Sequence, residues 1–303
     1  MTTATSAAND IEARVRQVVG NIRNLPTPPI VFTQIQKTIN RENTSAADVA
    51  KILSEDPSMS AKVLKLTNSA FYGMTREVES VKQAVLIIGF EAVKNLVLSA
   101  SVLGMFKGKE MNPEFQDRFW RHSLATALCA RSIARIAKSR FSHDPEAAFS
   151  VGLLHDIGKL VMNCFLSEDY AKVQSALVTN LETTDAQIEY AIFGFSHTHV
   201  GAALATNWNL PVSFVTAIAE HHSPRRRLRE DGVEEPAIAF VLALANCLAK
   251  RCFADDYANR IIEPPDSGSL DYLGLTPLGC LQIQENLKEE YQRAETFLSM
   301  AGR

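Results

Sequence analysis

The sequence predicts an all-α protein built from two helical lobes. Apolar residues repeat at intervals of close to 3.6 residues, the period of an α-helix, along most of the chain of 303 residues. No segment shows the strict alternation of apolar and polar residues that a half-buried strand requires. Proline and glycine fall between the periodic segments, where helices are expected to end. The length is sufficient for two cores, and we place the lobes at residues 10–109 and 110–303.

The composition is that of an ordinary globular protein. Apolar residues make up 46% of the chain and charged residues 21%, and the formal net charge is −3. This charge gives no general attraction to nucleic acid or to anionic lipid. Five scattered cysteines indicate reduced thiols rather than a disulfide framework. Residues 1–9 are polar, are expected to be disordered and do not resemble a signal peptide, and no apolar run reaches membrane-spanning length. We therefore expect a cytoplasmic protein without a nucleic-acid or membrane partner.

Capping and turn residues define the helices of the first lobe. Ser45 and Asp48 form a capping-box pattern, Pro57 occupies a first-turn position, and Gly89 separates two helical segments. The prolines within residues 26–29 predict a rigid turn. The expected helices are Asp10–Ile22, Val31–Asn40, Ala46–Ser54, Asp56–Asn68, Ser80–Ile88 and Glu91–Phe106.

Four segments of this lobe closely resemble the bacterial HDOD family. They are Leu25–Pro29 (LPTPP), Asp56–Ser60 (DPSMS), Val63–Gly73 (VLKLTNSAFYG) and Ala84–Gly89 (AVLIIG). The resemblance extends from Leu25 to His222, and the NSAFYG segment is highly specific. It implies a signalling-associated branch of the HD metal-dependent phosphohydrolases, with an HD-domain-like helical bundle and an additional N-terminal helical lobe. Within the NSAFYG segment we expect Asn68 and Ser69 to cap a helix end rather than to take part in catalysis.

A second series of helices is expected in the second lobe. They are Phe119–Ala137, Pro145–Met162, Glu168–Val178, Thr184–Ile192, a helix after His197, Pro211–Glu220, Ala237–Phe253 and Leu278–Met300. Loops are expected at Phe141–Asp144, Pro224–Glu235 and Glu263–Leu270. The loop Pro224–Glu235 carries four arginines, which we interpret as a solvated connection, with phosphate binding as the alternative.

A His-Asp pair lies inside an apolar segment of this lobe. The segment is Val151–Leu160, and it contains His155, Asp156 and, one turn further on, Lys159. Its length with the flanks predicts one buried helix, Pro145–Met162. Burial of an imidazole and a carboxylate is costly unless each finds a partner. A metal ion is the commonest partner for that pair, and a mutual hydrogen bond that only holds a core helix in place is the alternative.

The remaining histidines favour the metal interpretation. They are His122, His197 and the pair His221-His222, and with His155-Asp156 they follow one another at intervals of about one helix and one loop. This spacing suits four helices that deliver ligands into one bundle interior, so we expect the side chains to converge in one cavity. Imidazole and carboxylate ligands together suit Fe, Mn, Zn or Ni. His199 is expected to point elsewhere, toward solvent or as a helix cap.

The family resemblance implies roles for the residues of the HD pattern. His122, His155 and Asp156 match the metal ligands that HD phosphohydrolases share. Lys159 matches the lysine that contacts substrate phosphate in those enzymes. Their final aspartate falls at Asn246, and a neutral amide is a weaker metal ligand than a carboxylate. Metal affinity and the activation of a bound water should both be reduced by this change.

The HD-GYP branch of the same superfamily adds ligands that this chain matches in part. His197 matches an added histidine, and His221 and His222 match a His-His pair. Ser-Pro follows that pair in place of the expected Glu, no Gly-Tyr-Pro motif follows, and Arg118 stands where iron-binding members carry a glutamate. The chain thus matches most of the ligands but lacks the carboxylates that lower the pKa of a bound water.

These observations lead to two functional hypotheses. The first is a non-catalytic regulatory module with a partial metal site that binds a signalling protein or a phosphate-bearing small ligand. Asn246 and the HDOD-specific first lobe favour it. The alternative is a metal-dependent phosphohydrolase or cyclic-dinucleotide phosphodiesterase that uses the histidine set together with Lys159.

Overall fold

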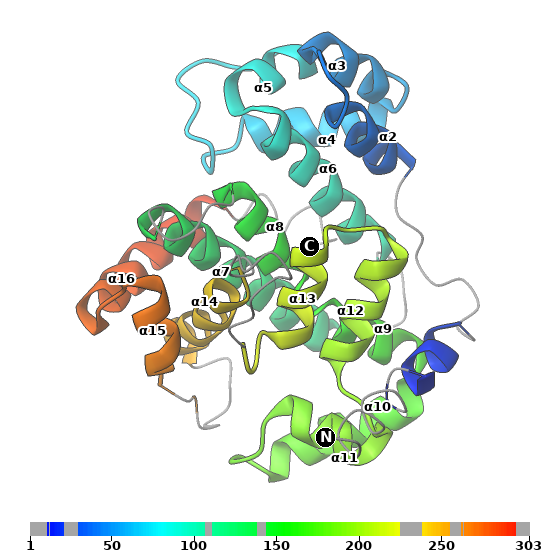
Figure 1. Ribbon diagram of the computed structural model, residues 1–303, viewed down its shortest axis with the longest axis vertical. Coiled ribbons are helices and arrows are strands. Elements are labelled where there is room, and N and C mark those ends of the chain that lie inside the picture. Colours follow the sequence, from blue (N-terminus) through cyan, green and yellow to red (C-terminus); the bar gives the residue numbers. More distant parts are fainter. Residues whose placement is uncertain are drawn as a thin grey trace, which may run out of the picture.

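The computed structural model confirms the all-α prediction. It describes residues 11, 13–20, 30–106, 111–137, 144–224, 238–254, 262 and 264–294. Every regular element within these ranges is a helix (Figure 1). The expected disordered start, the proline turn, most of the arginine-containing loop and the expected lobe boundary at residue 109 lie outside the described residues. The boundary therefore stays a prediction.

The helices of the expected first lobe lie in the upper part of Figure 1, and the last of them runs down into the rest of the molecule. Its helices are α2 Ile30–Ile39, α3 Ala46–Ser54, α4 Pro57–Thr67, α5 Val81–Ile88 and α6 Phe90–Met105. The capping box predicted for Ser45 and Asp48 is confirmed, and it begins α3. The side chain of Asp56 accepts a hydrogen bond from the backbone N–H of Met59 and so caps α4. Gly89 separates α5 from α6 at a φ of 89°, a conformation that favours glycine.

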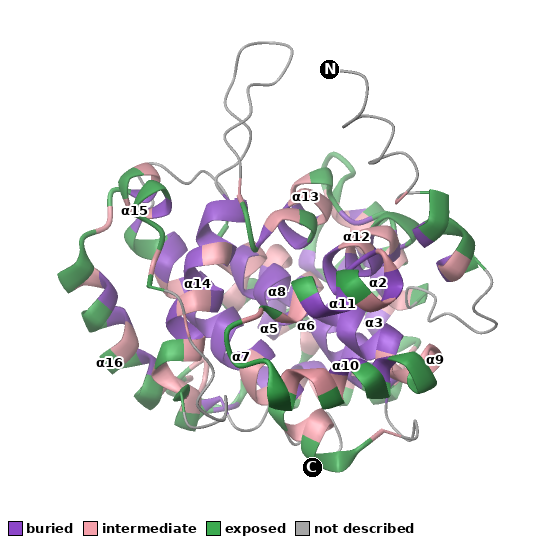
Figure 2. Ribbon diagram, turned by 90° about the horizontal axis from the view of Figure 1, so that it is seen from below, coloured by how far each residue is buried: buried purple, intermediate pink, exposed green. Residues whose placement is uncertain are grey.

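The second lobe packs its helices around three central ones. Its helices are α7 Pro113–Ile136, α8 Pro145–Leu154, α9 Ile157–Phe165, α10 Ser167–Thr179, α11 Asp185–Phe193, α12 His197–Asn207, α13 Val212–Glu220, α14 Ile238–Cys252, α15 Ser267–Leu273 and α16 Pro277–Arg293. The central helices α7, α8 and α14 are buried over most of their length (Figure 2). They form the interior into which the predicted ligands point.

The structure differs from the sequence prediction in three helices of this lobe. The single buried helix expected at Pro145–Met162 is interrupted by a turn at His155 and Asp156, so it is described as α8 and α9. The side chain of His155 binds the carbonyl of Gly152 in the last turn of α8, where it competes with the helical ladder. In addition, α7 begins six residues before the expected Phe119, and α15 occupies part of the expected loop Glu263–Leu270.

Within the described ranges no single helix is long and apolar enough to cross a membrane. Two pairs of neighbouring helices reach that length only when both members are counted, and each pair is bent by 119°. The helices α6, α8 and α9 of these pairs are largely buried inside the protein.

The first residue of the NSAFYG segment is an asparagine whose side chain makes two hydrogen bonds. Asn68 is the C-cap residue of α4, and its amide donates to the carbonyl of Val78 at 2.9 Å and accepts from the Val78 N–H at 2.7 Å. The hydroxyl of Ser69 donates to the carbonyl of Leu66 in the last turn of α4. The expected capping role of both residues is confirmed, and Asn68 also closes the loop that follows.

The aromatic residues of the same segment join the first lobe to the second. The ring of Phe71 lies 3.9 Å from the guanidinium carbon of the buried Arg131 on α7. The hydroxyl of Tyr72 donates to Glu146 in the first turn of α8 at 3.5 Å. Arg131 in turn forms ion pairs with Glu146 and with Glu290 on α16. The segment therefore contacts both helices that lead to the candidate site.

Two glycines allow the helices around the site to approach closely. A Cβ at Gly152 on α8 would lie 2.6 Å from the Cα of Ala127 on α7. A Cβ at Gly158 on α9 would overlap the carbonyl oxygen of His197 at the start of α12. Backbone atoms on both sides leave no room for a side chain to rearrange. These contacts hold α8 against α7 and α9 against α12, on both sides of the turn that carries His155 and Asp156.

Replacement of Gly158 by Ala should destabilise the protein strongly. The new methyl group overlaps backbone rather than a flexible side chain, so we expect a loss of at least about 3 kcal/mol in the free energy of unfolding. The matched control is Gly104→Ala in α6, where the nearest atom would be Lys62 Nζ at 3.9 Å. That change should be neutral or stabilising by about 1 kcal/mol. Urea denaturation of both variants measures the difference, and equal stabilities would refute the close-packing argument.

Candidate metal centre

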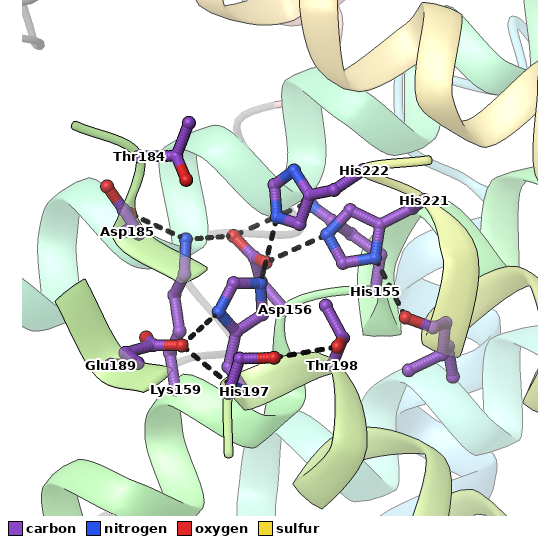
Figure 3. Close-up of polar contacts among 12 residues, drawn as sticks. His155, Asp156, Lys159, Thr184, Asp185, Glu189, His197, Thr198, His221 and His222 are labelled. Atoms are coloured by element: carbon purple, nitrogen blue, oxygen red, sulfur yellow. Dashed lines mark hydrogen bonds and ion pairs between the residues drawn. The ribbon is translucent and has the colours of Figure 1, made fainter. Parts of the chain in front are cut away.

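Four helix ends and one helix interior deliver the predicted ligands to one place. His122 lies within α7, and His155 and Asp156 occupy the turn between α8 and α9. His197 is the first residue of α12, and the pair after α13 completes the set (Figure 3). Of the predicted histidines, His155, His197 and His221 are almost completely buried. The structure thus brings the six predicted His and Asp side chains together, while their role as ligands stays a prediction.

Asp156 lies at the centre of this cluster, and its two oxygens face different histidines. The Nε2 atoms of His122 and His155 lie 3.7 and 3.4 Å from Oδ2. The Nε2 atoms of His197 and His221 lie 3.1 and 3.5 Å from Oδ1. The side chains therefore form two groups with donor atoms within 4.8 Å of one another, and Asp156 belongs to both groups. We call them the Oδ2 group and the Oδ1 group, and the latter also contains His222.

Backbone carbonyls orient two of the imidazoles. His155 Nδ1 lies 2.7 Å from the carbonyl oxygen of Gly152, and His221 Nδ1 lies 2.9 Å from that of Ile218. Each carbonyl accepts, so each Nδ1 carries the proton. The Nε2 atoms of both rings consequently face Asp156, and Nε2 is the atom that each ring offers to a metal ion.

A buried carboxylate orients the third imidazole. Glu189 on α11 accepts from the backbone N–H of His197 at 2.7 Å and from its Nδ1 at 2.6 Å. Glu189 and His197 have no exposed surface. A carboxylate behind a ligating histidine fixes the orientation of the ring and makes its other nitrogen a better ligand.

Opposite charges determine the ionisation of the central pair. Burial raises the pKa of the Asp156 carboxyl, but His155, Lys159 and His197 outweigh burial and hold that pKa well below its usual range. Burial lowers the pKa of His197, but Glu189 and Asp156 outweigh it and raise that pKa to about 9. Without a metal ion, Asp156 is therefore ionised and His197 is protonated at neutral pH.

Burial favours the neutral form of three of the other imidazoles. It lowers the pKa of His221 to about 3, and it lowers the pKa of His122 and His222 well below the usual range. The charge of Lys250 on α14 lowers the pKa of His122 and His222 further. Neutral imidazoles are ready to accept a metal ion without first losing a proton.

Unsatisfied buried atoms show that the Oδ1 group fits a cation. Asp156 Oδ1 and His221 Nε2 are buried and have no hydrogen-bond partner, although they lie 3.5 Å apart. Both atoms carry lone pairs, so no proton between them satisfies the arrangement. His197 Nε2 and His222 Nε2 lie 3.1 Å apart in the same group. Nitrogen and carboxylate ligands in this number suit Fe, Mn, Zn or Ni.

The Oδ2 group is satisfied without a metal ion. His122 Nε2 lies 3.2 Å from His155 Nε2, so a hydrogen bond joins the two rings. Asp156 Oδ2 accepts from Lys159 Nζ at 2.8 Å. A metal ion in this group would have to displace both of these hydrogen bonds. The two groups are therefore unequal, and the Oδ1 group is the better metal site.

Lys159 lies between two carboxylates. Its ammonium group donates to Asp156 at 2.8 Å and to Asp185 in the first turn of α11 at 2.9 Å (Figure 3). Burial lowers the pKa of Lys159, but Asp156 and Asp185 outweigh burial and raise that pKa well above its usual range. Lys159 is thus protonated, and the two carboxylates balance its positive charge. The family-based expectation that it contacts a phosphate stays a prediction.

The last predicted ligand and the last histidine occupy different surroundings. Asn246 on α14 is buried, its Oδ1 has no hydrogen-bond partner, and it lines a cavity together with His221 and His222. Its role as a ligand stays a prediction. His199 caps the start of α12, where its Nδ1 accepts from the backbone N–H of Ser196. The expectation that His199 acts as a cap is confirmed.

Sequence reasoning did not identify four residues that shape this centre. They are Gly158, Asp185, Glu189 and Lys250. Gly158 allows α9 to approach α12, and Asp185 binds Lys159. Glu189 orients His197, and Lys250 adds a positive charge on α14. Glu189 lies eight residues before His197 on another helix, so no local motif marks the pair. Only Lys250 left a signal, since it follows Asn246 by four residues and so shares its helix face.

A family model of the HDOD domain matches residues 25–224, which is more than half of the chain. The chain belongs to the HDOD family. The match includes the whole first lobe from Leu25 and the cluster as far as His222. It ends before α14, so Asn246 and Lys250 lie outside the matched range.

Relatives with similar sequences are longer proteins. An uncharacterized protein of Treponema pallidum is 24% identical over 206 residues, which are 68% of this chain and 39% of that protein. Ribonuclease Y of Thermus thermophilus is 26% identical over 193 residues, which are 61% of this chain and 28% of that enzyme. The matches span less than half the length of these relatives.

Solved structures share the fold over nearly the whole chain. An HDOD domain protein of unknown function from Geobacter sulfurreducens has a TM-score of 0.77 and 24% identity, and the match covers 96% of this chain and 99% of that one. A candidate phosphohydrolase from Shewanella amazonensis has a TM-score of 0.71 and 24% identity, with 96% and 98% coverage. A candidate signal-transduction protein from Marinobacter aquaeolei has a TM-score of 0.76 and 23% identity, with 98% and 65% coverage. At these identities the likeness shows the fold alone.

Glu189→Gln should weaken metal binding while the fold is retained. The amide keeps the shape of the side chain but removes the charge behind His197, and loss of such a partner typically costs about 10–100-fold in metal affinity. Titration of the apo-protein with Mn²⁺ and Zn²⁺ measures the change, and circular dichroism monitors the fold. Glu285→Gln, on the exposed surface of α16, is the control and should leave both unchanged. Unaltered metal affinity in Glu189→Gln would show that Glu189 has only a structural role.

Proposed function

We propose that this chain is a regulatory HDOD module that binds a transition metal ion and, at that ion, a phosphate-bearing small ligand, without efficient hydrolysis. Signal transmission to other proteins is the role that this activity would serve. The observation that carries the proposal is the inequality of the two groups around Asp156. One group has unsatisfied lone pairs that suit a cation, and the other is already satisfied by His122 and Lys159.

Specific residues would hold the ion. The Oδ1 group offers Asp156, His197, His221 and His222 as ligands. When bound, a transition metal ion supplies a positive centre that attracts phosphate oxygens and acidifies a bound water. The chain itself contributes the orientation of the rings through Glu189 and the backbone carbonyls. Asp156, His197 and His221 are buried, whereas His222 is exposed, so bulk water is kept from three of the four ligands. Exclusion of water strengthens the attraction for an anion.

The described part of the chain offers few groups that would act as a catalytic base. Asp156 is the only carboxylate in either group of candidate ligands among the described residues. Glu189 is bonded to His197, and Asp185 is bonded to Lys159. Asn246 stands where the family resemblance places an aspartate. An activated water needs a group that accepts its proton, so this arrangement favours binding over hydrolysis.

A metal-dependent phosphohydrolase, including a cyclic-dinucleotide phosphodiesterase, is the second candidate. The shared carboxylate favours it, because each oxygen of Asp156 faces its own set of imidazoles as in two-metal hydrolytic sites. Displacement of Lys159 from Oδ2 would be required before a second ion binds there. The number of bound ions therefore distinguishes the two functions.

The purified chain should hold one tightly bound transition metal ion, and Asp156→Asn should abolish this binding. Elemental analysis and titration with Fe²⁺, Mn²⁺, Zn²⁺ and Ni²⁺ measure the stoichiometry. Hydrolysis of bis(p-nitrophenyl) phosphate and of cyclic dinucleotides should stay at the rate of the free metal ion. Two ions per chain with rapid hydrolysis would support the phosphohydrolase instead. Absence of binding for all four metals would mean that the histidines are structural.

Asn246→Asp should increase metal affinity by about tenfold, since it adds a negative charge to the cavity wall beside His221 and His222. Asn207→Asp, on the exposed end of α12, adds the same charge away from the cavity and is the control. Metal titration of both variants against the unchanged chain gives the comparison. If Asn246→Asp binds metal no more tightly than Asn207→Asp, the position does not influence the centre.

A further inference from the structure

A cavity of about 450 Å³ adjoins the metal centre. The starts of α11 and α15, the residues after α13 and one face of α14 line it. His221 and His222 lie in its wall, so the cavity opens onto the Oδ1 group. Its volume lies within the range of small-molecule sites, about 300–1,000 Å³.

The ammonium group of Lys159 lies directly behind one wall of this cavity. Asp185 lines the cavity and accepts a hydrogen bond from Lys159 Nζ at 2.9 Å, whereas Lys159 itself does not line it. In Figure 3 the side chains of Asp185, Lys159 and Asp156 form a row, with Asp185 at one end. The Asp185 carboxylate therefore stands between the ammonium group and the cavity.

The two carboxylates that hold Lys159 have different surroundings. The Asp156 side chain is 2% exposed and contacts the imidazoles of the metal centre. The Asp185 side chain is 25% exposed and belongs to the first residue of α11. A partly exposed side chain at a helix end reaches another rotamer with less rearrangement of buried groups than a side chain in the core. Of the two carboxylates, Asp185 is the one that a ligand in the cavity can displace from Lys159.

A phosphate group offers Lys159 the same kind of contact as the Asp185 carboxylate. Both groups present charged oxygens that accept a strong hydrogen bond from an ammonium group. A phosphate monoester carries nearly two negative charges at neutral pH, whereas a carboxylate carries one. A neutral ligand offers only weak acceptors and cannot replace an ion pair at 2.9 Å. Asp185 therefore favours the entry of strong anions over that of other ligands.

We propose that the Asp185 carboxylate occupies the position of a ligand's phosphate beside Lys159, and that a phosphate monoester in the cavity binds by displacing Asp185 from Lys159. The inference rests on the proposed function, for which it names a residue that sets affinity and selectivity. No covalent bond changes in this exchange. Lys159 Nζ replaces one hydrogen-bond acceptor by another and keeps its bond to Asp156. Asp185 thus acts as an internal competitor of the ligand.

The test measures binding of inorganic phosphate by calorimetry to the full chain, loaded with whichever of the four metal ions it binds most tightly. Asp185→Asn should tighten phosphate binding by at least about tenfold, because the uncharged amide holds Lys159 less strongly. Asp266→Asn is the matched control, since Asp266 lines the same cavity but accepts from the N–H and the hydroxyl of Ser269. Its exposed charge is screened, so the control should change phosphate affinity by no more than about twofold.

A second comparison separates the release of Lys159 from a loss of repulsion. In a chain that carries Lys159→Met, the further change Asp185→Asn should give no gain in phosphate affinity, since no ammonium group is left to release. Metal content and circular dichroism are recorded for every variant. If Lys159→Met does not fold or hold metal, the difference between Asp185→Asn and Asp266→Asn decides alone.

Three results would overturn the inference and leave the proposed function in place. The first is equal phosphate affinity in Asp185→Asn and the unchanged chain, and the second is an equal gain in Asp266→Asn. The third is a gain that persists in the Lys159→Met background, since repulsion alone would then explain it. A chain that binds no metal, or metal-loaded protein that binds no phosphate in any variant, would overturn the proposed function and, with it, this inference.

Discussion

The close approach of α9 to the start of α12 at Gly158 is the constraint on which the candidate site depends. Glycine is required there because a Cβ would overlap the carbonyl oxygen of His197. Asp156 lies two residues before Gly158, so this contact brings its Oδ1 to 3.1 Å from His197 Nε2. Gly152 has the same effect on the other side, where α8 packs onto the backbone of α7. Close backbone contacts between neighbouring helices thus fix where the histidines of the site lie.

In this arrangement the carboxylate of Asp156 lies next to several positively charged groups, and its two oxygens are satisfied to different extents. Asp156 is almost fully buried, and burial of an isolated carboxylate would be very costly. Lys159 compensates Oδ2, and protonated His197 lies near Oδ1 without satisfying it. The unsatisfied oxygen faces the cavity side of the cluster, where His221 and His222 lie. A cation bound there would satisfy the lone pairs of Asp156 Oδ1 and His221 Nε2. It would leave the hydrogen bonds of Lys159 to Asp156 and Asp185 in place, as expected of a centre that binds a ligand.

Helical periodicity and capping signals were sufficient to predict the fold, whereas the site was only partly predictable. The capping box at Ser45 fixed the start of α3 to the residue, because its hydrogen bonds are local. The convergence of the histidines was predictable from their spacing, since successive helices of one bundle face a shared interior. The turn between α8 and α9 was missed, because apolar periodicity continues through it. Glu189 was missed because its bond to His197 depends on how α11 packs against α12, and no local pattern encodes that packing.

The NSAFYG segment contacts the helices that carry the same centre. Phe71 covers Arg131 on α7, and Tyr72 contacts Glu146 in the first turn of α8. The helix α8 then runs from Glu146 to the turn that holds Asp156, and Gly152 packs it tightly against α7 on the way. Asn68 anchors the segment at Val78, so the loop itself is also held in one conformation. The NSAFYG segment, one of the four that resemble the HDOD family, thus contacts both helices that lead to the candidate metal centre.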